Sequence, residues 1–159
     1  MKIRQARSED AATILTLIRE LAIYEKAEHE VRTGLNEIRE TLFAEEAKAR
    51  ALLVEVEAQV VAYAVYFYNY STWLGKPGIY LEDLYVRPAF RKRGIARALL
   101  KHIANIAVKE DCGRFEWAVL DWNSPAIRFY ESLGARAQDE WTIYRLSGDS
   151  LRKFAGSDE

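Results

Sequence analysis

Residues 81–100, LEDLYVRPAFRKRGIARALL, place a strand, a basic loop and a glycine at a helix start, and this order constrains the fold most. Six Lys or Arg and no Asp or Glu occur from Leu84 to Val108, although the whole chain carries 23 basic and 24 acidic residues. Backbone N–H groups at a helix N-terminus attract anions, and Gly94 has no Cβ to obstruct a phosphate. The segment therefore predicts either a site for a small polyphosphate or a solvated basic helix face.

Hydrophobic periodicity predicts an α+β (mixed α/β) fold, in which helices cover a mixed sheet. Apolar residues three and four positions apart indicate helices, and runs rich in Val and Tyr indicate strands. The expected strands are Lys2–Gln5, Leu52–Glu57, Val60–Tyr68, Ile79–Val86, Arg114–Leu120 and Trp141–Leu146, with a hairpin turn at Ala58 and Gln59. The expected helices run from Ser8 or Asp10 to about Tyr24, over Leu35–Leu42, from Gly94 to about Lys109, and from Asn123 to Gly134.

Length and composition predict one cytoplasmic globular domain over residues 1–155, followed by a loose tail over 156–159. Hydrophobic residues make up 50% of the chain, which is too many for disorder, and a net charge of −1 argues against a nucleic-acid binder. The apolar run Val60–Phe67 is too short to cross a bilayer, and the first ten residues contain no signal core. The lone Cys112 suits a reducing compartment and predicts neither a disulfide nor a metal site.

Two motifs at a defined separation point to one family. Arg91-x-x-Gly94-x-Ala96 fits the R/Q-x-x-G-x-G/A pattern, with a strand before it and an amphipathic helix after it. About thirty residues later, the stretch from Asn123 to Gly134 fits N-x-x-A-x-x-F-Y-x-x-x-G. The chain thus resembles the GNAT superfamily of acetyl-CoA-dependent N-acetyltransferases, and a central mixed sheet with helices on both faces is implied.

The resemblance extends over nearly the whole chain and favours one branch. ELAIYEKAE, YSTWLGK, YLEDLYV and AVLDWN are similar to diamine acetyltransferases, and YSTW and AVLDWN are closest to thialysine acetyltransferases. The implied substrate is a small primary amine such as thialysine, a lysine-like molecule or a short diamine. The polyamine branch carries an acidic residue near the position of Ser71, so long polyamines are expected to be poor substrates. The resemblance also implies a homodimer.

The resemblance implies where acetyl-CoA would bind. Two parallel strands would splay apart after Glu82, and backbone groups of the segment that follows would hold the pantetheine arm. The N–H groups of the basic loop would cradle the pyrophosphate, and the second motif would contact the cofactor from the other side. The residues implied are Leu84, Tyr85, Val86, Arg91, Lys92, Arg93, Gly94, Ile95, Ala96, Arg97, Asn123, Ser124, Pro125, Ala126 and Tyr130.

Glu82 is the candidate general base. It alternates with Leu84 and Val86, so period two predicts a partly desolvated carboxylate on an apolar sheet face, suited to accept a proton near neutral pH. The alternative is a glutamate of an edge strand in water. Asp83 points to the other face, and the resemblance makes Asp83, Tyr24 and Glu25 substrate-binding candidates together with Glu82.

Tyr130 is the candidate general acid. By resemblance, its phenol donates a proton to the departing CoA thiolate, in a direct transfer within a ternary complex. The alternative is a core aromatic residue at helical spacing. Cys112, His29 and His102 lack the partners that nucleophilic or metal chemistry needs, so a structural role is favoured for each. A peptide or protein N-acetyltransferase and a non-catalytic acyl-CoA-binding regulatory domain are the competing functions.

Overall fold

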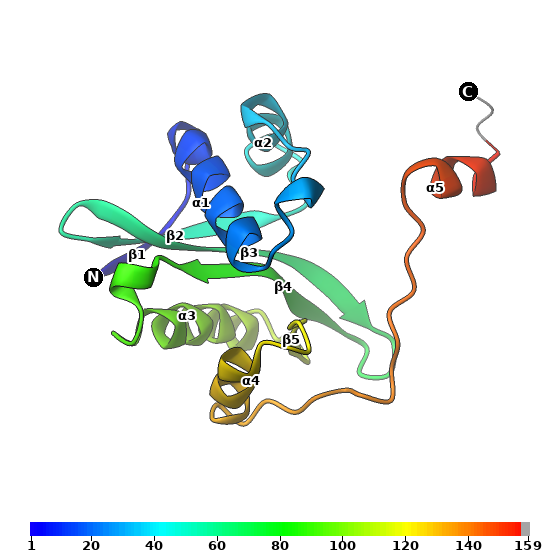
Figure 1. Cartoon of the computed structure of the whole chain (residues 1–159). Helices are drawn as coiled ribbons and strands as arrows, with labels where there is room; N and C mark the ends of the chain where they lie inside the picture. The colour runs from blue at the N-terminus through cyan, green and yellow to red at the C-terminus, as the bar shows by residue number, and fades with distance from the viewer. Residues whose placement is uncertain (157–159) are drawn as a thin grey trace. The chain divides into compact units, whose positions relative to one another are not determined.

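In the computed structural model, which describes residues 1–156, five strands form one sheet in the order β1-β2-β3-β4-β5 (Figure 1). Neighbouring strands from β1 to β4 are antiparallel, and β4 and β5 are parallel, which confirms the mixed sheet. The sheet lies in the unit Met1–Ala118, and a second compact unit begins at Val119. The strands are β1 Lys2–Gln5, β2 Arg50–Val56, β3 Gln59–Ser71, β4 Lys76–Val86 and β5 Phe115–Trp117.

Helices cover both faces of this sheet, so the expected α+β architecture is confirmed (Figure 1). Helices α1 (Ala11–Tyr24) and α2 (Leu35–Leu42) lie on one face, and α3 (Ile95–Lys109) lies on the other. Short 3-10 turns occur at Ser8–Asp10, Glu28–Glu30 and Pro88–Phe90. The second unit contains α4 (Ser124–Glu131) and α5 (Gly148–Phe154).

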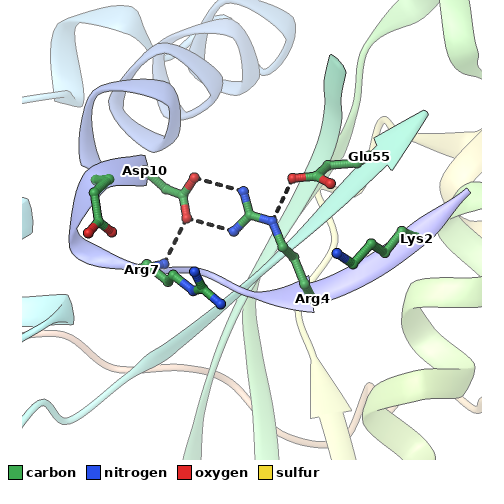
Figure 2. A pocket seen from close by; sticks show the side chains of 6 residues that line it. Lys2, Arg4, Arg7, Asp10 and Glu55 are labelled. Carbon is green, nitrogen blue, oxygen red and sulfur yellow. Dashed lines mark hydrogen bonds and ion pairs between the residues drawn. The ribbon is translucent and has the colours of Figure 1, made fainter. Parts of the chain in front are cut away.

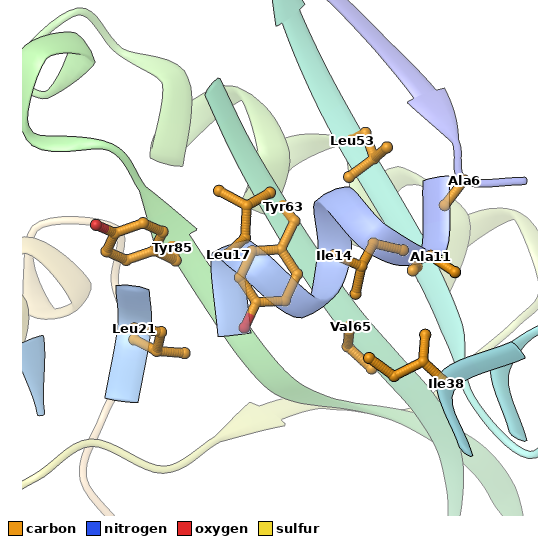
Figure 3. Close-up of a cluster of buried hydrophobic side chains, with 11 residues drawn as sticks. Ala6, Ala11, Ile14, Leu17, Leu21, Ile38, Leu53, Tyr63, Val65 and Tyr85 are labelled. Atoms are coloured by element: carbon orange, nitrogen blue, oxygen red, sulfur yellow. The ribbon is translucent and has the colours of Figure 1, made fainter. Parts of the chain in front are cut away.

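The core beneath α1 determines which sheet residues are withdrawn from water. Ile14, Leu17 and Leu21, spaced three and four apart, form the buried stripe of the helix. They pack against side chains that alternate along the strands, and Figure 3 shows Tyr63 in this cluster. Burying each Leu or Ile contributes roughly 1.5–3 kcal/mol. The sheet members of the cluster are Ala51, Leu53, Tyr63, Val65 and Tyr85.

Several expected element boundaries are wrong by a few residues. The β2–β3 hairpin turns at Glu57 and Ala58, with φ of 50° and 62°, because left-handed conformations at both positions match the strand twist. The strand expected at Ile79 begins already at Lys76, and the strand expected over Arg114–Leu120 is only Phe115–Trp117. The expected tail keeps only Gly156 within the described residues, because 157–159 lie outside them.

The expected last strand over Trp141–Leu146 is wrong, because the described part of the second unit, residues 119–156, contains no strand with which it could pair. These residues have no regular secondary structure, and their apolar side chains are exposed, with Tyr144 94% exposed. A strand is stable only when a neighbour accepts its ladder of hydrogen bonds, so alternation alone does not form one. Helix α5, which begins two residues after this segment, was not predicted from the sequence.

A partly buried ion-pair network connects β1 with β2 and with the turn before α1 (Figure 2). The Arg4 guanidinium donates to Asp10 at 2.7 and 2.9 Å and to Glu55 at 2.6 Å. Asp10 also accepts the Arg7 N–H at 2.7 Å. These contacts hold the pKa of Asp10 below its usual 3.8, with the Arg4 hydrogen bond as the largest cause. These side chains line a depression of about 330 Å³, in which Arg4 is paired with both Asp10 and Glu55, and this pairing indicates a structural role.

We expect the Asp10 network to stabilise the fold in a pH-dependent way. Asp10→Asn should lower the free energy of unfolding by roughly 1–2 kcal/mol at pH 7, since a charge-assisted pair is lost. Because folding lowers the pKa of Asp10, the stabilisation is present above pH 4 and is lost as pH falls through the lower, folded-state value. Urea unfolding at pH 7, 5 and 3 measures the difference.

The matched control is Asp111→Asn, which removes a 2.7 Å pair with Lys76 between exposed side chains. It should change stability by less than about 0.5 kcal/mol at every pH. A difference between wild type and Asp10→Asn that stays constant down to pH 3 would contradict a contribution from the ionised carboxylate.

Candidate active site

The pairing of β4 with β5 ends just before the acidic pair of residues. Leu81 is the last β4 residue paired with β5, opposite Trp117, whereas β4 continues to Val86. Among the described residues, the β5 side of β4 therefore has no paired strand beyond Leu81. The two parallel strands were expected to diverge after Glu82, and their pairing ends one residue earlier, at Leu81. Backbone groups of β4 beyond Leu81 are left without ladder partners on that edge.

Glu82 is the extra residue of a β-bulge. Tyr66 of β3 pairs with Leu81 and Val65 pairs with Asp83, so no β3 residue is opposite Glu82. A bulge reverses the alternation of side chains between its two sides. The Glu82 side chain is exposed, and the expectation of a partly desolvated Glu82 is therefore wrong. Period-two reasoning failed here because it assumes an unbroken ladder.

Asp83, next to the bulge, is a half-buried carboxylate. Its Oδ2 accepts a hydrogen bond of 2.9 Å from the Tyr63 hydroxyl. Burial raises the pKa of Asp83, the Tyr63 hydrogen bond lowers it, and the negative charge of Glu82 raises it further. Asp83 and Tyr63 thus lie on the face that α1 covers.

Glu25 brings a second carboxylate to the same place from the end of α1. The helix ends at Tyr24, as expected, and the Glu25 N–H donates to the Leu21 carbonyl at 2.9 Å. Burial and the negative charge of Asp83 raise the pKa of Glu25. The expected neighbours Glu25 and Asp83 are therefore close enough to interact. Two such carboxylates concentrate negative charge, which favours a nearby cation.

Tyr63 is the residue of this cluster that sequence reasoning missed. Alternation places Tyr63 and Val65 on one face, and Asp83 and Tyr85 share a face on β4. Only the register, with Tyr63 opposite Tyr85, makes Asp83 the diagonal neighbour of Tyr63. Cross-strand register is a tertiary property, so the signal in the sequence was incomplete.

Arg91 connects the basic loop with β4 and with the end of α1. Its Nε donates to the Val86 carbonyl at 2.9 Å, and its guanidinium lies 4.7 Å from the centre of the Tyr24 ring. It also lies 5.6 Å from the centre of the Tyr85 ring. Cation–π contacts of this kind stabilise by about 0.5–1 kcal/mol. The side chain of Arg91 is thus held by the protein's own groups, and Lys92 and Arg93 are more exposed.

The N-terminus of α3 has the geometry of an anion site. Gly94 has φ of 77°, and a Cβ there would meet nothing within 4 Å. The Ala98 N–H donates to the Gly94 carbonyl at 2.9 Å, so the N–H groups of Gly94, Ile95 and Ala96 precede the helical hydrogen bonds. The loop between β4 and α3 contains Pro88–Phe90, and Arg93 lies over the Phe90 ring. Arg97 extends the positive charge along the first turn.

The remaining predicted site residues lie in the second unit. Asn123 caps α4, accepting the Ala126 N–H at 3.4 Å, and Ser124 and Pro125 begin the helix. Tyr130 is half-buried near the end of α4, and the centres of its ring and the Phe129 ring are 5.5 Å apart. The place of these residues relative to Glu82 stays a prediction. Gly134 has φ of 89°, as expected for a residue after a helix end.

Other chemistry has little support within the described residues. Burial and the charges of Glu110 and Asp111 raise the pKa of Cys112, which disfavours a thiolate nucleophile. No group of three His, Cys, Asp or Glu side chains in residues 1–156 is arranged to hold a metal ion. No helix in the same range is long and apolar enough to span a bilayer.

The fold and this site define a class of enzyme. The sequence profile of the Acetyltransferase (GNAT) family matches residues 13–135, so the chain belongs to that family and is an acetyltransferase. It is 39% identical to the thialysine N-epsilon-acetyltransferase of Mus musculus, over 98% of this chain and 97% of that one. The enzyme of the same name from Caenorhabditis elegans is 33% identical, and 92% of each chain is covered.

Solved structures agree with the fold. An integron cassette protein from the mobile metagenome of V. cholerae matches with a TM-score of 0.83 and 25% identity, over 97% of this chain and 96% of that one. A ribosomal-protein-alanine N-acetyltransferase from Brucella melitensis matches with a TM-score of 0.72 and 22% identity, over 93% and 100% of the two chains. The latter likeness concerns the fold alone.

Family membership implies acetyl-CoA as the acetyl donor. Two observations fit a pyrophosphate at the α3 N-terminus: the open space at Gly94 and the N–H groups that precede the first helical hydrogen bond. Lys92 and Arg93 supply positive charge next to these groups. The residues present are thus suited to the group that the family implies.

Gly94→Asp should abolish binding of acetyl-CoA, because the side chain adds bulk and negative charge beside the expected pyrophosphate. In wild type, acetyl-CoA at about 100 times its Kd should raise the Tm by roughly 5–10 °C. The variant should show a rise of less than about 1 °C. Differential scanning fluorimetry and titration calorimetry measure both quantities.

The matched control is Gly75→Asp in the β3–β4 turn. Gly75 has φ of 62°, and a Cβ there would likewise meet nothing within 4 Å, so the backbone strain is comparable. This control should lower the Tm of the free protein without reducing the shift caused by acetyl-CoA. An unchanged affinity in Gly94→Asp would overturn the assignment of this helix start to the phosphate.

Proposed function

We propose that the protein transfers the acetyl group of acetyl-CoA to a primary amine of a small cationic molecule. Thialysine, a lysine-like molecule or a short diamine is the proposed substrate. The observation that carries the proposal is a pair of half-buried carboxylates, Glu25 directly after α1 and Asp83 near the end of β4. Neither has a Lys or Arg ion-pair partner within residues 1–156. An ammonium group would supply the missing positive charge.

The similarity to thialysine N-epsilon-acetyltransferases over almost the full length supports the amine class. Ser71 supports the shorter members of that class. It is 4% exposed, and its Oγ accepts the Leu74 N–H at 3.2 Å within the turn after β3. It offers no carboxylate to a distal ammonium, and long polyamines are therefore expected to be poor substrates.

The proposed chemistry divides the acid and base work between Glu82 and Tyr130. Glu82, which is exposed at the bulge, accepts a proton from the substrate ammonium, directly or through a water. Acetyl-CoA, when bound, supplies the thioester that the free amine attacks. Tyr130 then donates its phenolic proton to the leaving thiolate, so no acyl-enzyme is formed. Most of the rate enhancement comes from holding the two substrates together.

A cytoplasmic homodimer is part of the proposal. The exposed apolar residues Ile143 and Tyr144 of the second unit support a partner surface, since side chains of this kind are usually covered. A monomeric mass in light scattering would contradict the dimer and leave the acetyltransferase activity unaffected.

Tyr130→Phe should reduce kcat by roughly 10- to 1000-fold, because the ring is kept and only the proton donor is removed. The KM for acetyl-CoA should change little. The measurement is CoA release under saturating substrates. Phe129→Leu, which perturbs the neighbouring ring and not the proton donor, is the packing control and should retain most of the turnover. Turnover near that of wild type in Tyr130→Phe, with the chemical step rate-limiting, would make Tyr130 a packing residue.

Glu82→Gln should lose activity most severely near neutral pH, because the amine must then lose its proton without a base. Raising the pH supplies free amine and should restore part of the activity. The penalty should be smaller for thialysine than for lysine, since the thialysine sulfur makes its amine easier to deprotonate. The measurement is a pH–rate profile of both enzymes on thialysine, lysine, a short diamine and spermidine.

Glu110→Gln serves as the control, because it removes one negative charge outside this site, at the end of α3. An equal loss in Glu82→Gln at every pH and for every amine would mean that Glu82 orients the substrate and does not take its proton. A clear preference for spermidine would overturn the proposed substrate while leaving acetyl transfer intact.

A further inference from the structure

We propose that Tyr63 is a positioning residue for the amine, whose hydroxyl orients the Asp83 carboxylate so that it holds the substrate ammonium together with Glu25. This inference rests on the proposed function and deepens it, because it names the group that makes the half-buried carboxylate a cation site.

The geometry of Tyr63 is that of a rigid donor. Its side chain is 0% exposed, and its ring belongs to the cluster beneath α1 that includes Leu17, Leu21 and Tyr85 (Figure 3). A ring packed on all sides has little freedom, so the core fixes the position of the hydroxyl oxygen, and the acceptor sets the direction of the O–H bond. The hydroxyl lies 2.9 Å from Asp83 Oδ2, which makes Asp83 its acceptor.

Among the groups around Asp83, the Tyr63 hydroxyl is the one that favours the ionised carboxylate. Glu25 approaches from the end of α1, Glu82 is the adjacent residue, and Tyr85 lies opposite Tyr63 on the same face. Burial and the charge of Glu82 raise the pKa of Asp83, whereas the Tyr63 hydrogen bond lowers it. Without that hydrogen bond, the carboxyl would take up a proton at higher pH and lose its attraction for a cation.

A phenol suits this task better than a cationic partner would. Burial and the charge of Asp83 raise the pKa of Tyr63 far above neutrality, so its hydroxyl remains a donor throughout the working range. An Arg or Lys in its place would stabilise the carboxylate but would also cancel its charge. The neutral donor satisfies one acceptor site of Asp83 and leaves the negative charge for the substrate.

The first test is Tyr63→Phe, compared with wild type in the CoA-release assay. We expect kcat/KM for the preferred amine to fall roughly 10- to 100-fold near neutral pH, mainly through a higher KM for the amine. The KM for acetyl-CoA should be unchanged. Because the substitution raises the pKa of Asp83, the ratio of wild-type to variant activity should decrease as pH rises and Asp83 ionises in both.

Two further variants separate positioning from packing. Tyr66→Phe removes another buried hydroxyl, from a residue 1% exposed outside the α1 cluster, and should leave the amine KM within about twofold of wild type. In an Asp83→Asn background, Tyr63→Phe should cause no further loss, since both substitutions remove the same interaction. A loss in Tyr63→Phe that is equal at every pH and accompanied by an unchanged amine KM would overturn the proposal.

The second test does not depend on turnover. Carbon-13 NMR of aspartate-labelled protein follows the ionisation of Asp83, and the signal missing in Asp83→Asn assigns it. Asp83 should titrate at higher pH in Tyr63→Phe than in wild type, and at the same pH in Tyr66→Phe. Identical titration in wild type and Tyr63→Phe would overturn the role of Tyr63. Absence of CoA release by wild type with every amine would instead overturn the proposed function, and the titration would still decide the inference.

Discussion

The one-residue bulge at Glu82 is the constraint on which the rest of the site depends. It sends Glu82 into solvent and Asp83 onto the face beneath α1, although the two residues are adjacent. A regular ladder would place Asp83 on the same face as the buried Leu81, and the bulge separates them. The pairing of β4 with β5 ends at Leu81, so the backbone edge and the two carboxylates are presented at the same point of the sheet.

The hydrophobic core beneath α1 gives this arrangement its electrostatic character. The packing that stabilises the helix also withdraws Tyr63 and Asp83 from water and brings Glu25 next to them. Apolar burial therefore raises the pKa of both carboxyl groups, and the hydrogen bond from the Tyr63 hydroxyl lowers that of Asp83. The contacts that stabilise the fold are thus also those on which the proposed recognition of a cationic substrate depends. Glu82 remains exposed, as its proposed role in proton transfer requires.

The segment proposed to bind acetyl-CoA is formed by residues that are close together in the chain. The left-handed Gly94, the N–H groups of the first turn of α3 and the basic loop follow one another in the chain. Arg91 links this loop with the residues proposed to bind the amine, since it contacts both the Val86 carbonyl and the Tyr24 ring. Loss of the Arg91 side chain would therefore disturb the edge of β4 as well as the charge around the cofactor.

The sequence by itself determined the helices over Ala11–Tyr24, Leu35–Leu42 and Ile95–Lys109, the β2–β3 hairpin and the motif at Gly94, because each depends on neighbours in the chain. It failed for Trp141–Leu146, since alternation predicts a strand only where a partner strand is present. Only the tertiary structure decided that Glu82 is exposed and Asp83 half-buried. It also decided that Tyr63 contacts Asp83. A bulge and a cross-strand register arise from pairing between distant segments, and no local pattern of residues encodes them.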